Sequence, residues 1–129
     1  ELYRIAVSYA SDSARYHGFF DRILELYPDD PAANINAAAS LLQRGDAAAA
    51  ERCLDHAAGA IAAPDAAMAS AFANNRGAAL LLENRLDEAE PLLRRAADAG
   101  RAEARRNLEE LERKRGDNAR LERYRNISQ

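Results

Sequence analysis

The chain has 129 residues, enough for one domain with a continuous core but too few for two independent ones. Alanine is abundant, Trp is absent, and Val and Thr are scarce, a composition that favours helices over sheets. The net charge of −3 does not fit a nucleic-acid-binding domain, which is normally strongly basic. We therefore expect an all-α single domain with no nucleic-acid partner.

The N-terminal region contains two expected helices. Residues Glu1 to Val7 form an amphipathic segment, and we expect this helix to run to about Ala10. Ser11-Asp12-Ser13 then breaks it and offers N-cap oxygens to the next helix, expected over 14–27. Because the chain lacks an initiator Met and opens inside an amphipathic segment, we interpret it as a domain excised from a longer protein.

Proline, glycine and aspartate mark the next boundaries. The segment Pro28-Asp29-Asp30-Pro31 ends one helix and starts another, with an aspartate as N-cap and a proline in the first helical turn. The third expected helix spans 31–44, and Gly45-Asp46 turns the chain into a fourth helix over 47–61. Two helices joined by so short a turn pack antiparallel.

A second helix pair follows the same plan. The fifth expected helix spans 65–83, and Asn84-Arg85 takes the place of the Gly-Asp turn. The sixth helix ends near Ala99, and Asp87 and Glu90 have the spacing of a capping box near its start.

The C-terminal region is rich in charged residues. A seventh helix over 102–115 has few apolar positions and is expected to act as a solvating cap. Gly116-Asp117 predicts another turn, followed by a short helix over 119–124 and a frayed tail over 126–129. The arginines are interleaved with glutamates, which indicates a solvated helix rather than a nucleic-acid site.

The two helix pairs carry matching landmarks, separated by about the 34 residues of a helix-pair repeat plus a few more. The matched pairs are Ala38 and Gly77, Ala50 and Ala89, Leu54 and Leu93, and Ala57 and Ala96. This pattern resembles the tetratricopeptide repeat, although Asn34 and Ala73 stand where that repeat has tryptophan. The resemblance implies a right-handed α-α superhelix of helix-turn-helix repeats. It divides the single domain 1–129 into a half repeat (1–28), two repeats (31–63 and 65–100) and capping helices (102–125).

A narrower resemblance involves the stretch from Tyr27 to Ala38, together with 75–79 and 88–92. These segments are similar to the C-terminal repeat domain of cell-envelope proteins of the Bacteroides group, which have an uncharacterised N-terminal domain. The resemblance implies a periplasmic or outer-membrane-associated protein.

Residues able to carry chemistry are few and isolated. Cys53 is the only cysteine, which excludes an internal disulfide, and we expect a small buried thiol. His17 and His56 lie on different expected helices, each without a second histidine at helical spacing, and the acidic pairs Asp29-Asp30 and Asp87-Glu88 lie at expected helix starts, where negative charge is favourable. With no phosphate loop or nucleophile motif, we expect no enzyme, catalytic residue, metal or cofactor. No apolar run is long enough for membrane insertion.

The tetratricopeptide resemblance implies that inner helices line a concave groove that binds an extended peptide or a partner helix. By repeat position, the candidate groove residues are Asn36, Gln43, Asn74, Asn75, Arg106 and Asn107. An asparagine amide both donates and accepts hydrogen bonds, which suits recognition of a peptide main chain. Alternatively, these asparagines bond to neighbouring helices within the stack.

We therefore expect a non-catalytic protein-protein interaction or assembly scaffold that binds a peptide or partner protein. The alternative is a structural spacer or self-association module whose groove is filled by its own parent chain or by a second copy, as in a homodimer. A third hypothesis is the regulatory domain of an enzyme whose catalytic region lies elsewhere.

Overall fold

The computed structural model of the protein describes residues 5–8, 17–59 and 65–128. In chain order its helices are α1 (His17–Leu26), α2 (Pro31–Gln43), α3 (Ala47–Ala58), α4 (Ala66–Leu82), α5 (Leu86–Asp98) and α6 (Ala102–Ser128). These ranges contain no strand, so the prediction of an all-α fold is confirmed for the part of the chain that they cover.

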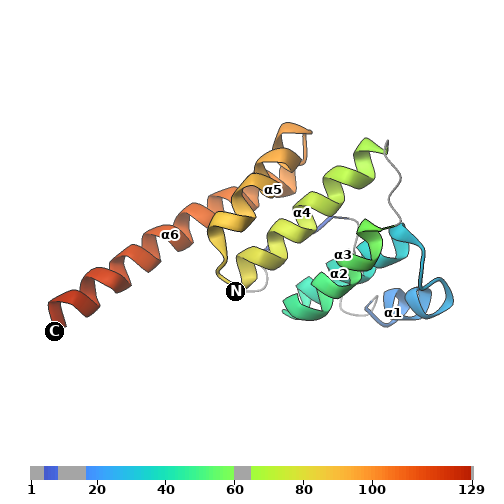
Figure 1. Ribbon diagram of the computed structural model, residues 1–129, viewed down its shortest axis with the longest axis horizontal. Coiled ribbons are helices and arrows are strands. Elements are labelled where there is room, and N and C mark those ends of the chain that lie inside the picture. The colour runs from blue at the N-terminus through green and yellow to red at the C-terminus, as the bar shows by residue number, and fades with distance from the viewer. Residues whose placement is uncertain (1–4, 9–16, 60–64, 129) are drawn as a thin grey trace.

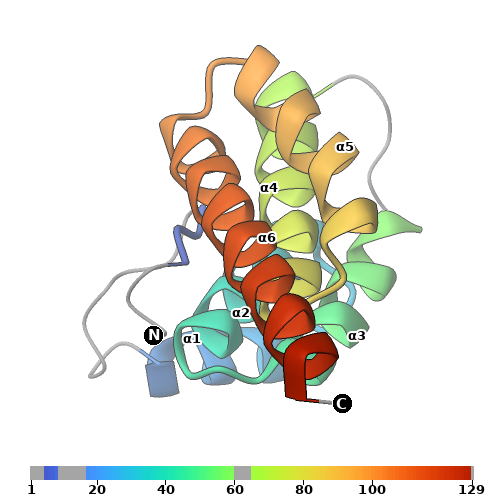
Figure 2. The same cartoon turned by 90° about the vertical axis from the view of Figure 1, so that its left-hand side faces the viewer.

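The helices form a series in which each one packs against the next (Figure 1). The tightest pairs are α2 with α3 and α4 with α5, each joined by a short turn. Helix α4 also contacts α2 and α6, so these three helices form one layer, and α3 and α5 pack beside it. This arrangement places α4 at the centre of the molecule (Figure 2).

Local signals set the inner boundaries as the sequence predicts. The aspartate caps are Asp30, which accepts from Ala33 N at 2.8 Å, Asp46 from Ala49 N at 3.0 Å, and Asp65 from Met68 N at 3.0 Å. Each cap satisfies an amide that has no partner within the helix. Gly45 and Asn84 adopt φ values of 82° and 60°, the left-handed conformation that ends α2 and α4.

Small residues let α4 and α5 approach closely. Ala89 and Leu93 of α5 are fully buried, and so are Ala50 and Leu54 at the matching positions of α3. A Cβ atom placed on Gly77 would lie 2.6 Å from Cδ2 of Leu93, which is closer than side chains pack. Glycine at this position therefore leaves space for a leucine from the neighbouring helix.

The expected N-terminal helix is wrong over residues 5–8, which are not helical. Ile5 and Val7 pack on the main hydrophobic core, whereas the main chain of Ala6 and Ser8 bonds to side chains of α4 and α6. This non-helical conformation therefore allows packing on the core and hydrogen bonding to α4 and α6 at the same time. The expected break at 11–13 lies outside the described residues.

The expected turn at Gly116-Asp117 is also wrong, because α6 continues through it to Ser128. Gly116 is not among the residues with positive φ, and a glycine inside a helix costs only about 1 kcal/mol. Ion pairs three residues apart support the helix, namely Glu110 with Arg113, Glu112 with Arg115, Asp117 with Arg120, and Glu122 with Arg125. The expected short helix and frayed tail are thus the distal part of α6.

The carboxylates at the start of α5 do not form a capping box. The N-cap is Arg85, which makes no side-chain capping bond. Asp87 and Glu90 instead lie 2.9 Å and 2.7 Å from the guanidinium of Arg115, and these ion pairs link α5 to α6. No helix among the described residues is both long and apolar enough to cross a membrane.

Candidate functional site

Three asparagines from two helices converge on the N-terminal segment. Asn74 and Asn75 lie on α4 and Asn107 on α6, and all three side chains are fully buried. We call these three residues the asparagine clamp. The segment Ile5–Ser8, which they contact, runs beside the first half of α6 (Figure 2).

Asn107 forms two hydrogen bonds with the main chain of Ala6. Its Oδ1 accepts from Ala6 N at 2.9 Å, and its Nδ2 donates to Ala6 O at 2.8 Å. A neighbouring β-strand forms the same reciprocal pair of bonds with the residue opposite. One side-chain amide therefore replaces a strand as the partner of Ala6.

Asn75 repeats this arrangement two residues further along. Its Oδ1 accepts from Ser8 N at 2.9 Å, and its Nδ2 donates to Ser8 O at 3.2 Å. Because residues 6 and 8 lie two apart in an extended segment, their main-chain groups face the same edge. Asn75 and Asn107 bond to main-chain atoms of the segment, so these bonds do not depend on its side chains.

Asn74 joins the two halves of the clamp. Its Nδ2 donates to Ala6 O at 3.0 Å and to Ser8 Oγ at 3.2 Å. Its Oδ1 accepts from Asn107 Nδ2 at 2.9 Å. The bonds of Asn74 therefore link the two amides that hold Ala6 and Ser8 into one network with the segment.

A carboxylate completes the site on the side of α6. Ser8 is buried, and its Oγ donates to Glu103 Oε2 at 2.8 Å. Burial by itself would raise the pKa of Glu103, but hydrogen bonds from its own backbone N–H and from Ser8, together with nearby Arg101, hold the pKa below its ordinary value. The carboxylate is therefore ionised at neutral pH and acts as an acceptor.

Acid should loosen this contact. A carboxyl whose pKa is lowered by folding adds stability above its unfolded pKa and loses that contribution as the pH falls through the folded pKa. For Glu103 the loss should occur below pH 4.5. We expect hydrogen exchange at the Ser8 amide, measured by NMR from pH 6 to about pH 3 and corrected for the intrinsic rate, to become less protected in the wild type. Glu103→Gln should lack this step; an identical pH profile in both proteins would contradict the assignment.

The structure gives the other three predicted groove residues different surroundings. Asn36 donates to Ala32 O in its own helix at 3.1 Å, and Gln43 Oε1 lies 3.3 Å from His17 Nε2. Arg106 is exposed on α6. Of the six candidate groove residues, the structure therefore brings together Asn74, Asn75 and Asn107, and it places the other three elsewhere; their role in binding a peptide stays a prediction.

The sequence analysis missed Ser8 and Glu103, together with the segment that occupies the clamp. A usable signal was present, because Tyr3, Ile5 and Val7 alternate with smaller or polar residues. Such alternation is typical of an extended segment with one buried side.

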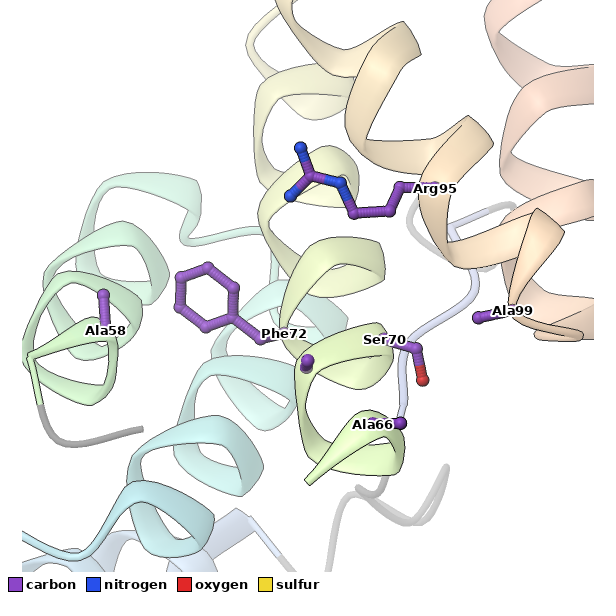
Figure 3. A pocket seen from close by; sticks show the side chains of 7 residues that line it. Ala58, Ala66, Ser70, Phe72, Arg95 and Ala99 are labelled. Atoms are coloured by element: carbon purple, nitrogen blue, oxygen red, sulfur yellow. The ribbon is translucent and has the colours of Figure 1, made fainter. Parts of the chain in front are cut away.

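A separate hollow lies between α3, α4 and α5 (Figure 3). Its volume is about 370 Å³, and it is lined by Ala58, Ala66, Ala69, Ser70, Phe72, Arg95 and Ala99. The Phe72 ring also lies 5.5 Å from the guanidinium carbon of Arg76. The lining is mostly apolar and contains one strongly charged side chain, so these residues supply no acid-base pair and no activated nucleophile.

The surroundings of Cys53 and His56 fit a structural role for these side chains rather than a reactive one. Cys53 is half-buried, and burial raises the pKa of its thiol, which disfavours the reactive thiolate. His56 Nε2 lies 2.8 Å from Asp29 Oδ1 at the surface. Within the described ranges, no three His, Cys, Asp or Glu residues are grouped so that they could hold a metal ion.

No protein-family model, curated protein or solved structure matches the chain. The functional argument therefore depends on the fold and on the geometry of the asparagine clamp.

Proposed function

We propose that this chain is a non-catalytic interaction and assembly module with a tetratricopeptide-like superhelix, in which the asparagine clamp holds an extended polypeptide by its main chain. The resident occupant is the segment Ile5–Ser8. The observation that carries this proposal is the pair of two-bond contacts, Asn107 with Ala6 and Asn75 with Ser8.

The helical arrangement supports the repeat class. Helices α2–α3 and α4–α5 form two close pairs, and a left-handed residue (Gly45 or Asn84) ends the first helix of each. Small buried residues, Ala50 and Ala89, occupy matching positions in the second helix of each pair. A series of such pairs in contact with their neighbours is the plan of a helical-repeat protein.

Two features favour the chain's own segment as occupant over a separate peptide. The segment is covalently attached, so its effective concentration at the clamp is on the order of millimolar. Ile5 is also buried in the hydrophobic core of the repeats, and an incoming peptide would have to replace that side chain. The clamp therefore serves as an internal anchor that fixes the N-terminal segment on α4 and α6.

Hydrogen exchange tests the anchor directly. In the full chain, NMR should show the amides of Ala6 and Ser8 protected by about 100-fold or more relative to an unstructured peptide. Asn75→Ala should remove most of the protection at Ser8, whereas Asn36→Ala, which alters a bond within α2, should leave it unchanged. Exchange in the wild type as fast as in the free peptide would refute the proposed anchor.

The second candidate function is binding of a separate peptide in place of the segment Ile5–Ser8. Hydrogen bonds to the main chain can form with peptides of many sequences. A synthetic peptide of residues 1–10, added to the full chain, should increase exchange at Ser8 of the chain itself if such replacement takes place.

The periplasmic or outer-membrane setting is also part of the proposal and depends on the sequence resemblance alone; cell fractionation tests it.

A further inference from the structure

The large apolar side chains that are exposed on the described residues fall into two groups. The first, which we call the α1 surface, consists of Phe19, Leu26 and Tyr27, with exposed fractions of 57%, 54% and 60%. The second, the α6 tail surface, consists of Leu121, Tyr124 and Ile127, with 56%, 71% and 83%. Helix α1 and the distal part of α6 lie at opposite ends of the molecule (Figure 1).

Phe19 and Leu26 lie on one side of α1, with Tyr27 directly after its end, and the α6 tail group lies along one side of α6. The spacing of Phe19, Leu26 and Tyr27 is that of a single helical face, and Leu121, Tyr124 and Ile127 recur every third residue. A shallow hollow of about 480 Å³ lies against the tail, lined by Asp117, Arg120, Leu121 and Tyr124. Single exposed apolar residues are ordinary, but grouped ones mark interaction surfaces.

The order of helix packing indicates what covers these surfaces. Helices α2 and α4 each have a neighbour before and after them in the series, whereas α1 packs on α2 and α6 packs on α5 and α4. Among the described helices these two therefore stand at the ends of the series, and residues 117–128 of α6 are all exposed. The α1 of another copy can pack on this exposed part of α6.

Charge favours contact between unlike ends. Residues 17–30 carry the four carboxylates Asp21, Glu25, Asp29 and Asp30 and one arginine, Arg22; Arg44 of α2 pairs with Asp21, and the carboxylates still outnumber these two arginines. Residues 117–128 carry the three arginines Arg120, Arg123 and Arg125 and two carboxylates, Asp117 and Glu122. Two α1 ends brought together would repel each other, whereas an α1 end and an α6 tail attract.

We propose that copies of this chain associate head to tail, with the α1 surface of one copy on the α6 tail surface of the next. Helix α1 is about 15 Å long and residues 117–128 span about 18 Å, so the two surfaces match in length. With three large apolar residues on each side, the interface is small, and the association is expected to be weak and concentration-dependent. Because the contact joins different surfaces, it can repeat and form short chains of copies.

Sedimentation velocity of the full chain tests the proposal. The average mass should rise between about 10 µM and about 1 mM, the range in which weak complexes form. Phe19→Glu and Tyr124→Glu should each keep the protein monomeric over this range. Ala119→Glu, which places the same charge about 140° around α6 from Tyr124, should associate like the wild type. A monomeric wild type at the highest concentration would overturn the proposal.

Mixing the two variants distinguishes head-to-tail contact from pairing of like surfaces. Phe19→Glu retains an intact tail and Tyr124→Glu retains an intact α1 surface, so an equimolar mixture should form a 1:1 dimer and nothing larger. Self-association of Phe19→Glu alone would show pairing between two tails and overturn the proposal. Circular dichroism of each variant should match the wild type, because both side chains are exposed.

Discussion

Replacement of Asn107 by alanine should lower the free energy of unfolding by about 2–4 kcal/mol, since each buried polar group left without a partner costs about 1–3 kcal/mol. The variant loses both bonds to the main chain of Ala6 and the bond to Asn74 Oδ1. The Asn107 side chain is fully buried, so little water reaches the groups left behind. Urea unfolding followed by circular dichroism measures the change.

Two variants distinguish the loss of the bonds to Ala6 from the loss of an asparagine elsewhere in the fold. Asn36→Ala loses a single bond to Ala32 O within α2 and should cost less than about 1.5 kcal/mol. Asn107→Asp keeps the acceptor for Ala6 N but loses the donor to Ala6 O. It also adds a buried charge, so at neutral pH this variant too should lower the free energy of unfolding. Equal effects of Asn107→Ala and Asn36→Ala would show that the bonds to Ala6 add nothing to stability.

Ala89→Leu should destabilise the fold by about 1–3 kcal/mol through overpacking, which forces side chains or backbone to shift. Ala89 is fully buried on α5, and its carbonyl oxygen would lie 3.5 Å from a Cβ on Gly77. The three added carbons therefore enter the place where α4 and α5 approach most closely. Thermal unfolding of the full chain measures the loss.

The matched control adds the same three carbons where there is space. Ala119 is exposed on the distal part of α6, so Ala119→Leu should change the melting temperature very little. If Ala89→Leu melted like this control, α5 could not approach α4 as closely as Gly77 and Leu93 indicate.

Most of the described helix boundaries between residues 28 and 102 could be predicted because their signals are local; the fourth expected helix, over 47–61, instead ends at Ala58. An aspartate cap acts on an amide three residues later, as Asp30 does for Ala33, and a left-handed residue such as Gly45 ends the helix beside it. Gly116 shows the limit of such signals. Ion pairs within α6 lie on both sides of Gly116, Glu112 with Arg115 before it and Asp117 with Arg120 after it, and the helix continues through this glycine. Gly45, by contrast, ends α2.

The conformation of residues 5–8 depended on contacts that no local pattern contains. The bonds from Ser8 to Asn75 and from Ala6 to Asn107 join residues 67 and 101 positions apart. The amphipathic composition of this segment suits a helix, but in the structure Ile5 and Val7 pack on the core from a segment that is not helical. Tertiary contacts therefore overrode the helical prediction.

Three of the predicted groove residues lie together because repeat position selects a face of a helix, but repeat position does not say what lies against that face. Asn36 matches Asn75 by repeat position, yet the segment lies against α4 and α6, and the amide of Asn36 bonds to its own helix. Asn74, Asn75 and Asn107 differ from Asn36 in having an extended chain within reach.

The link between Ala6 and Asn107 has a consequence for how the protein folds. Helical-repeat proteins commonly fold from local contacts and can lose structure one unit at a time. A contact that spans 101 positions closes most of the chain into a loop, and such contacts slow folding because loop closure costs entropy before the bonds form. During synthesis Ile5–Ser8 is made before α6, so the half of the clamp that lies on α6 is missing until that helix has been made. Helix α6 therefore completes the contacts of Ile5–Ser8, and we expect the described helices to unfold together rather than one pair at a time.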